Sequence, residues 1–470
     1  MAFLPVILWT DALIFLLLAG IIWFVLFARR REHLRAPWKK VIESPQGMVA
    51  AIVLGLYVFI GLLDSLHYRV ALPELKAGTS RQYTNEVLSV FDALTYRLRT
   101  QVEKTYSAPF ATHLYAKESW EAQGKQIRDY PRLKYGGAHL QDLAQRDADI
   151  AALAFKGIVK GVFVWLLLVL AVLILAKRKQ ASTFGQAASL IWHGKTILPW
   201  RSGLITLGLV LIVSFCAAEL AQKYHLFGTD KVGQDVFYQA LKSIRTGLVI
   251  GTLTTLVTLP IALLLGISAG YFRGWADDVI QYIYTTLNSI PDVLLIAAAV
   301  LILQAYMDTH AEAFETISER ADLRLLFLCI ILGITSWTGL CRLLRGETLK
   351  LAEMEYIQAA RAFGVKPFKI IAQHILPNVM HIVLITLVLQ FSGLVLAEAV
   401  LSYVGVGVDP ATLSWGNMIN SARLEIAREP IVWWPLAAAF VLMFLLVLFA
   451  NLFSDAVRDA FDPRTQASRL

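Results

Sequence analysis

The sequence predicts an all-α protein that crosses a membrane about nine times and carries one polar insert between two of the crossings. The first observation is composition: of 470 residues, 57% are hydrophobic and 17% are charged, and the mean hydropathy is +0.59. Soluble domains carry more charge, about 25%. The second observation is that the apolar residues stand in continuous runs, near the roughly 20 residues that a membrane helix needs. The runs lack the alternation typical of barrel strands, so helices are expected.

The expected membrane helices follow one another along the whole chain. Short connections join most of them, and their ends are defined to within a few residues. They are residues 6–27, 48–63, 157–176, 203–221, 246–270, 290–307, 325–344, 382–400 and 431–453.

Basic residues stand beside these helices and orient the chain. They gather at residues 29–40, 177–179 and 342–369, and an even number of spans separates each pair of groups. Because cytoplasmic loops are enriched in Lys and Arg, one orientation satisfies all three groups. It places the N-terminus outside and the C-terminus in the cytoplasm. The net charge of +8 is explained by this distribution, so nucleic-acid binding is not expected.

The chain is expected to divide near residue 180. Residues 1–180 form an N-terminal extension with three spans and an external insert at about 64–155. Residues 181–470 hold the remaining six spans, with one sizeable cytoplasmic loop at about 345–380.

The external insert is expected to be small and helical. Apolar residues recur in it at the spacing of an amphipathic helix, and a second helical segment leads into the third span. The apolar positions are Val87, Phe91, Leu94, Leu98 and Val102.

The sequence gives no sign of an enzyme, a cofactor site or a metal site. The three cysteines lie in or beside apolar runs, without a partner at metal-ligand spacing. The stretch Gly194-Lys195-Thr196 ends like a phosphate-binding loop, but position 189 holds Ser where such a loop needs Gly. Any ATP hydrolysis would therefore require another chain.

The cytoplasmic loop contains an unusual polar segment, residues 355–377. Its Ala359-Ala360 pair favours a helix with a small-residue face, and Gly364 is suited to end that helix. Pro367 suits the first turn of a following helix, and Pro377 marks entry to the next span. The expected order is helix, glycine break, helix, proline. On these properties alone, an ordinary connection between two spans fits equally well.

This segment resembles the EAA loop of binding-protein-dependent permeases of bacterial ABC importers. That loop has Glu-Ala-Ala, three residues, Gly, and then Leu-Pro. Ala359, Ala360, Gly364, Leu376 and Pro377 match in register. Gln358 departs from the family by replacing Glu, which removes a charge from the expected docking contact.

Four further segments resemble the peptide and nickel branch of these permeases, in the same order along the chain. They lie at residues 228–236, 270–277, 397–407 and 457–464. The resemblance covers roughly residues 200–464, and residues 1–180 have no counterpart in the ordinary dipeptide or oligopeptide permease.

The resemblance implies a six-helix, MetI-like permease domain in the bacterial inner membrane. It implies four kinds of partner: membrane lipid, a second and different permease subunit, two ATPase subunits that use ATP and Mg, and an external substrate-binding protein. The ATPase-coupling residues it implies are Gln358, Ala359, Ala360, Gly364, Leu376 and Pro377. Candidates for an external gate or scaffold are Gly228, Thr229, Asp230, Asp235, Glu398, Gly405 and Gly407.

Two other classes of membrane protein stay open at this point. An ion-driven secondary transporter or channel predicts paired ionisable residues or broken helices at the bilayer midplane, which the sequence does not display. A membrane receptor would use the external insert for sensing, but it needs a cytoplasmic signalling domain. Peptides, nickel and related solutes share these loop motifs, so the substrate is not determined by the sequence.

Overall fold

The computed structural model describes residues 3–30, 32–72, 82–122, 125–180, 183–194, 196–310, 312 and 316–461. Within these residues, nine helical stretches are long and apolar enough to cross a membrane, which confirms the predicted number. Each overlaps one predicted span. They are Trp9–Phe27, Pro45–Asp64, Leu143–Leu175, Trp200–Ala221, Val236–Phe272, Asp292–Thr309, Ile317–Ala352, Pro367–Tyr403 and Trp434–Phe461. The resemblance over residues 457–464 continues past residue 461, outside the described residues.

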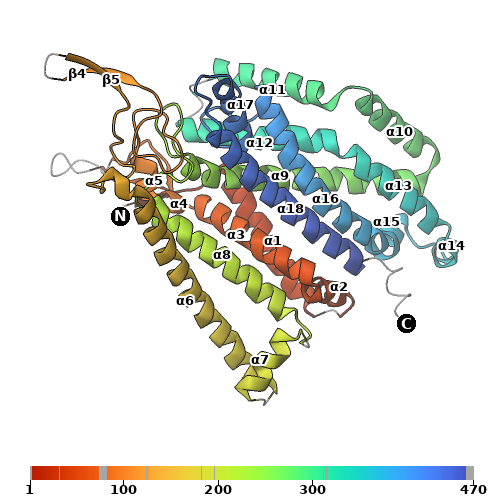
Figure 1. Cartoon of the computed structure of the whole chain (residues 1–470). Helices are drawn as coiled ribbons and strands as arrows, with labels where there is room; N and C mark the ends of the chain where they lie inside the picture. The colour runs from red at the N-terminus through yellow and green to blue at the C-terminus, as the bar shows by residue number, and fades with distance from the viewer. Residues whose placement is uncertain are drawn as a thin grey trace.

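Helix α9 is the central element of the fold. It spans Val236–Phe272, and 37 helical residues extend over about 55 Å, well beyond the hydrocarbon core. Asp235 begins it by accepting a hydrogen bond from the Tyr238 amide. Its neighbours in the bundle are α3 (Pro45–Asp64), α12 (Ile317–Ser336), α13 (Thr338–Ala352), α16 (Leu376–Tyr403) and α18 (Trp434–Phe461) (Figure 1).

Helices α6 (Arg146–Gln180) and α8 (Trp200–Ala221) form a pair that leans away from this bundle, with α7 (Phe184–Trp192) at its tip (Figure 1). The two helices touch closely because Gly157 faces the backbone of Cys216. A Cβ at Gly157 would lie 2.5 Å from the Cys216 Cα.

The N-terminal helices pack into the bundle. Helix α1 (Trp9–Ala28) contacts α12, and α2 (Glu32–Glu43) contacts α18. Arg245 of α9 joins α1 to α12, because its guanidinium lies 2.6 Å from the Asp11 carboxylate and 3.5 Å from that of Asp322. The division near residue 180 stays a prediction from the sequence.

The prediction of a helical insert is wrong for much of the insert. Strands β2 (His67–Val70) and β3 (Leu88–Ser89) form an antiparallel sheet with β1 (Phe3–Val6), in the order β1-β2-β3. A separate hairpin of β4 (Glu118–Ala122) and β5 (Lys125–Asp129) projects from the molecule (Figure 1). Backbone pairing with β1, far away in sequence, organises this part of the insert.

The amphipathic helix expected over residues 87–102 is present as two short helices, α4 (Val90–Leu94) and α5 (Tyr96–Thr100), separated at Thr95. The helix begins late because Leu88 and Ser89 pair with β2, and Ser89 then forms a capping box with Asp92. Leu94 is 69% exposed, so the apolar spacing does not mark a single buried face.

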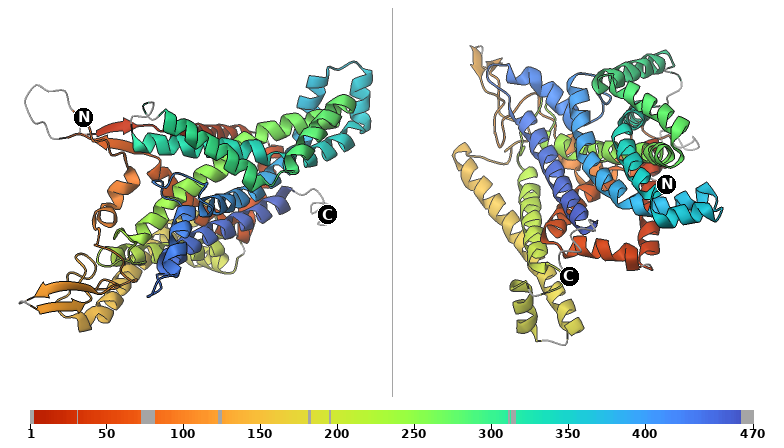
Figure 2. Two further views of the ribbon diagram at one scale, coloured as in Figure 1. Left: turned by 90° about the horizontal axis from the view of Figure 1, so that it is seen from above. Right: turned by 90° about the vertical axis from the view of Figure 1, so that its right-hand side faces the viewer.

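The two ends of the bundle carry different elements, and we call them the insert end and the loop end. The insert end holds the sheet, the segment 222–235 and α17 (Trp415–Ile426). The loop end lies far from the insert in Figure 1 and in the left-hand view of Figure 2. It holds α14 (Glu355–Ala362), α15 (Pro367–Ile370) and the π-helix η3 (Ile371–Ile375). The remaining elements are η1 (Leu143–Gln145), α10 (Gly274–Asn288) and α11 (Asp292–Thr309).

Candidate functional site

The 345–380 loop has the expected order of helix, glycine break, helix and proline. Helix α14 ends at Ala362, and Gly364 adopts a φ of +73° that favours glycine. The Val365 amide donates to the Ala360 carbonyl at 3.1 Å and closes the turn. Pro367 opens α15, and Pro377 lies in the first turn of α16.

One face of this loop is buried and the opposite face is exposed. Ile357, Ile370 and Ile375 are each fully buried in a core shared with α9, α10 and α13. Phe363 and Phe368 are 86% and 82% exposed. Neighbouring exposed aromatic side chains form apolar surface of the kind that marks interaction sites.

The resemblance-implied residues of the loop occupy both faces. Gln358 and Ala359 are exposed, together with Pro377, whereas Ala360 and Leu376 are half-buried. The Gln358 amide donates to the Glu353 carboxylate at 3.2 Å, so this side chain is held by the loop itself.

The loop is fixed to the turn that follows α9. The Arg361 guanidinium lies 4.4 Å from the centre of the Tyr271 ring, a cation–π contact. Arg273 forms an ion pair with Glu353, and this guanidinium lowers the pKa of the Glu353 carboxyl group. The loop and the end of α9 are therefore joined by charged contacts as well as by the buried core.

At the insert end, Gly228 and Thr229 contact the insert directly. The Thr229 hydroxyl donates to the Thr105 carbonyl at 2.8 Å and accepts from the Ser107 amide at 2.7 Å. A Cβ at Gly228 would lie 2.1 Å from the Ser107 carbonyl oxygen, so only glycine allows this approach. Residues proposed from sequence as an external scaffold thus hold the insert against the bundle.

A buried charge cluster strengthens the same junction. Asp235 Oδ2 lies 2.7 Å from His225 Nδ1, and Glu103 Oε1 of the insert lies 3.5 Å from His225 Nε2. Burial alone would lower the pKa of His225, but the two carboxylates raise it to about 9. Burial would likewise raise the pKa of Glu103, but His225 and three backbone amides lower it to about 2. The imidazolium is the favoured form in the folded chain.

We expect the attachment of the insert to weaken at alkaline pH. The pKa of His225 rises from 6.5 to about 9 on folding, so its contribution is complete below pH 6.5 and is lost as pH rises through 9. The pKa of Glu103 falls from 4.5 to about 2, so its contribution is complete above pH 4.5 and is lost toward pH 2. Protease cleavage within the insert, measured from pH 6 to 10 on the full chain, should accelerate toward pH 10. In His225→Gln, the rate should change less over that range, and an equal acceleration would contradict the assignment.

Glu398, Gly405 and Gly407 lie where α16 meets α17. Glu398 is 2% exposed and accepts a hydrogen bond from the Ser402 hydroxyl at 2.7 Å. Gly407 packs on the Ser402 backbone, and Gly405 has a φ of +86° with no described residue within 4 Å of the place of a Cβ. This arrangement suits a scaffold at the helix junction, one of the two roles for which Glu398 is a candidate, and that role stays a prediction.

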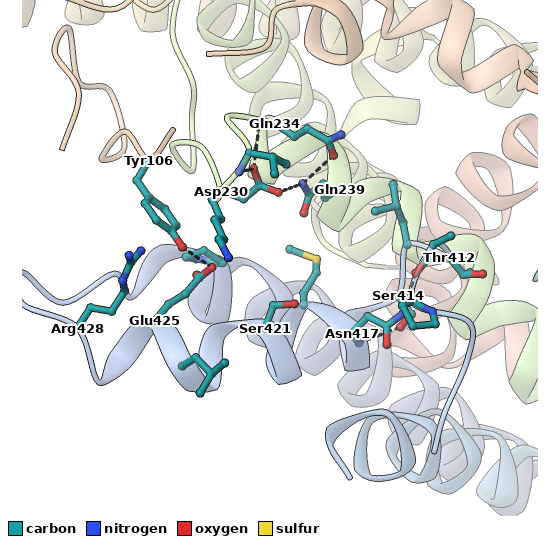
Figure 3. A pocket seen from close by; sticks show the side chains of 18 residues that line it. Tyr106, Asp230, Gln234, Gln239, Thr412, Ser414, Asn417, Ser421, Glu425 and Arg428 are labelled. Carbon is teal, nitrogen blue, oxygen red and sulfur yellow. Dashed lines mark hydrogen bonds between the residues drawn. The ribbon is translucent and has the colours of Figure 1, made fainter. Parts of the chain in front are cut away.

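A pocket of about 650 Å³ opens beside this junction at the insert end (Figure 3). Of the sequence-predicted residues, only Asp230 lines it. Tyr106 of the insert and Glu425 of α17 meet in its wall, with the Tyr106 hydroxyl donating to Glu425 Oε1 at 2.9 Å (Figure 3). Neither residue could be recognised from the sequence, because 319 positions separate them and neither stands in a motif.

Comparison with known proteins agrees with this architecture. The family model of the binding-protein-dependent transport system inner membrane component matches residues 262–467. The oligopeptide transport system permease protein OppC of Mycobacterium tuberculosis (strain H37Rv) is 32% identical over 245 residues, which cover 52% of this chain and 78% of that protein. The glutathione permease protein GsiD of Pectobacterium atrosepticum is also 32% identical over 245 residues, covering 52% and 74%.

A third relative and one solved structure have lower identity. The dipeptide permease protein DppC of Bacillus subtilis is 29% identical over 240 residues, covering 51% of this chain and 69% of that protein. The MetNI methionine ABC transporter, in inward-facing conformations, is 16% identical with a TM-score of 0.38, covering 48% and 97%.

The fold and the matched sequence define a multi-pass transport subunit of the inner membrane. The chain belongs to the binding-protein-dependent family of ABC importer permeases, in the branch that includes OppC, GsiD and DppC. Membership decides between the importer and the two alternative classes in favour of the importer.

Proposed function

We propose that the chain is one of two unlike permease subunits of an importer for peptides or related small solutes. The names of its relatives, which transport oligopeptides, glutathione and dipeptides, support this substrate class. The pathway lies between this chain and the second permease, and an external binding protein delivers the substrate. Two ATPase subunits bind ATP and Mg and hydrolyse the ATP.

The insert end faces the outside and the loop end faces the cytoplasm. The basic residues 29–40, 177–179 and 342–369 support this orientation, with the N-terminus outside and the C-terminus inside. The 345–380 loop then lies on the side where ATP is available.

The observation that carries the proposal is the pair of exposed phenylalanines on a loop whose opposite face is fully buried. Phe363 and Phe368 present aromatic surface for an ATPase subunit, while Ile357 and Ile370 anchor the same loop in the bundle. Displacement of the loop on ATP binding passes through Leu344 of α13 and Ile382 of α16 to the membrane helices. Small Ala359 and Ala360 allow close approach, and Gln358 contributes no charge to the contact.

Replacing Gly364 by valine tests this role. The variant must hold a branched residue at a φ of +73°, but no atom of the described residues lies within 4 Å of a new Cβ, so the strain is confined to the loop. The backbone strain of about 1–2 kcal/mol should redirect α15. We expect normal membrane insertion, continued ATP hydrolysis and uptake lowered by roughly tenfold, measured in vesicles with the assembled importer.

The matched control is Gly194→Val, at a φ of +66° and also without a neighbour within 4 Å among the described residues. It imposes the same kind of strain at the end of α7 and should leave uptake near normal. Normal uptake in Gly364→Val would show that the docking role is assigned to the wrong segment.

A further inference from the structure

The pocket at the insert end is built from three parts of the chain. Tyr106 comes from the insert, Asp230 and Gln234 from the segment before α9, and Glu425 from α17 (Figure 3). Its volume of about 650 Å³ falls within the range of small-molecule sites, roughly 300–1,000 Å³. The pocket therefore requires the insert in place.

One carboxylate oxygen of Glu425 has no hydrogen-bond donor in the part of the chain that the structure describes. The side chain is 7% exposed, and Oε1 accepts the hydrogen bond from Tyr106. Oε2 has no hydrogen-bond partner among the described residues. A buried carboxylate oxygen without a donor is costly, so a donor supplied by a ligand would be strongly favoured.

Asp230, the other acid in the pocket, is already satisfied. Its carboxylate accepts from the Gln239 side chain at 2.7 Å and from the Gln234 and Val232 amides at 2.8 and 3.0 Å. Asp230 therefore shapes the pocket wall, whereas Glu425 retains an acceptor for a ligand.

Two cations border the same pocket. Lys231 and Arg428 are exposed, and the Arg428 guanidinium lies 5.1 Å from the centre of the Tyr106 ring. Neither forms an ion pair within 4.0 Å among the residues that the structure describes. The buried Glu425 oxygen can accept a hydrogen bond from a cationic group, and the exposed Lys231 and Arg428 can attract an anionic group. Together they suit a ligand that carries both a positive and a negative charge.

We propose that this pocket binds a zwitterion of amino-acid or short-peptide size, whose primary ammonium group donates to Glu425 Oε2. The cations at the mouth attract its carboxylate, and Leu424 and Val232 offer apolar surface to its side chains. The inference rests on the proposed function and gives the insert a part in it, because Tyr106 positions the Glu425 carboxylate.

Equilibrium binding of glycyl-leucine to the purified full-length chain tests the site. N-acetyl-glycyl-leucine serves as the matched probe, because acetylation removes the ammonium charge and keeps the rest of the molecule. We expect acetylation to weaken binding by about tenfold or more, and Glu425→Gln to weaken binding of glycyl-leucine by a similar factor. Glu429→Gln, which removes an exposed carboxylate outside the pocket wall, should bind like the unaltered chain.

Glutamine at position 425 still accepts the Tyr106 hydrogen bond, and equal thermal unfolding temperatures would verify that the variant folds. Equal binding of the two probes, unchanged binding in Glu425→Gln, or no binding to the unaltered chain would each overturn the site. The binding assay contains no ATPase, so a negative binding result bears on the pocket and leaves the transport proposal to be tested separately. ATP-driven peptide uptake that persists without binding here would reject the pocket alone, whereas absent uptake in the assembled complex would reject the transport proposal.

Discussion

Replacing Phe363 and Phe368 by serine is expected to abolish ATP-driven uptake while the chain stays folded in the membrane. Both side chains are more than four-fifths exposed, so their removal should change the free energy of unfolding by roughly 0.5 kcal/mol or less. Aromatic anchors of an interface commonly contribute about 2 kcal/mol or more each, which corresponds to about thirtyfold in affinity. Loss of both should leave the ATPase subunits largely unbound.

Co-purification of the ATPase subunits with the membrane complex measures this effect directly, and vesicle uptake measures its consequence. Trp192→Ser is the matched control, because Trp192 is an aromatic residue with 66% exposure on α7, away from the 345–380 loop. The control should retain both the ATPases and uptake. If the double variant retains them as well, the exposed face of the loop is not the docking surface.

The sequence predicts the membrane helices and the 345–380 loop well because their signals are local. A continuous apolar run is sufficient for a spanning helix, and all nine expected spans overlap observed ones. Gly364 permits a positive φ that ends one helix, and Pro367 fixes its own φ at a value suited to the first turn of the next, so the break and restart of the helix follow from single residues. The exposure of Phe363 did not follow from these signals, because it depends on the orientation of the whole loop.

The insert was harder to predict because distant contacts determine it. Ser107 meets Thr229 across 122 positions, and no periodicity in either segment reports the contact. Leu88 and Ser89 lie within the helix expected over residues 87–102 but form a strand because β2 offers them backbone partners. The Tyr106–Glu425 pair of the pocket was missed for the same reason. A lone Glu in a polar helix carries no signal of burial.

Helix α9 connects the insert to the 345–380 loop. Asp235, at the beginning of α9, pairs with His225, which also faces Glu103 of the insert. Near the end of α9, the ring of Tyr271 makes a cation–π contact with Arg361 of the 345–380 loop. A single continuous helix of about 55 Å therefore contacts both the insert and the loop. At the attachment of the insert to the segment before α9, the backbones of Gly233 and Glu103 are in direct contact.

Gly233→Ala is expected to detach the insert from the bundle. The Glu103 amide donates to the Gly233 carbonyl at 2.9 Å, and a Cβ at Gly233 would lie 1.9 Å from the Glu103 carbonyl oxygen. Neither atom can move without moving backbone, and Gly233 also has a φ of +77°. Overpacking costs about 1–3 kcal/mol and the left-handed backbone about 1–2 kcal/mol, so we expect a loss of about 2–5 kcal/mol in docking free energy.

Gly405→Ala distinguishes the cost of the steric clash from the cost of the left-handed backbone. Gly405 has a φ of +86°, but no described residue comes within 4 Å of a new Cβ, so this variant carries the backbone strain without the clash. Protease cleavage within residues 82–122, measured on the full chain at pH 6, should accelerate far more in Gly233→Ala than in Gly405→Ala. Because Tyr106 leaves with the insert, binding of glycyl-leucine should fall in the same variant. Equal cleavage in the two variants would mean that the close approach of Gly233 to Glu103 does not hold the insert in place.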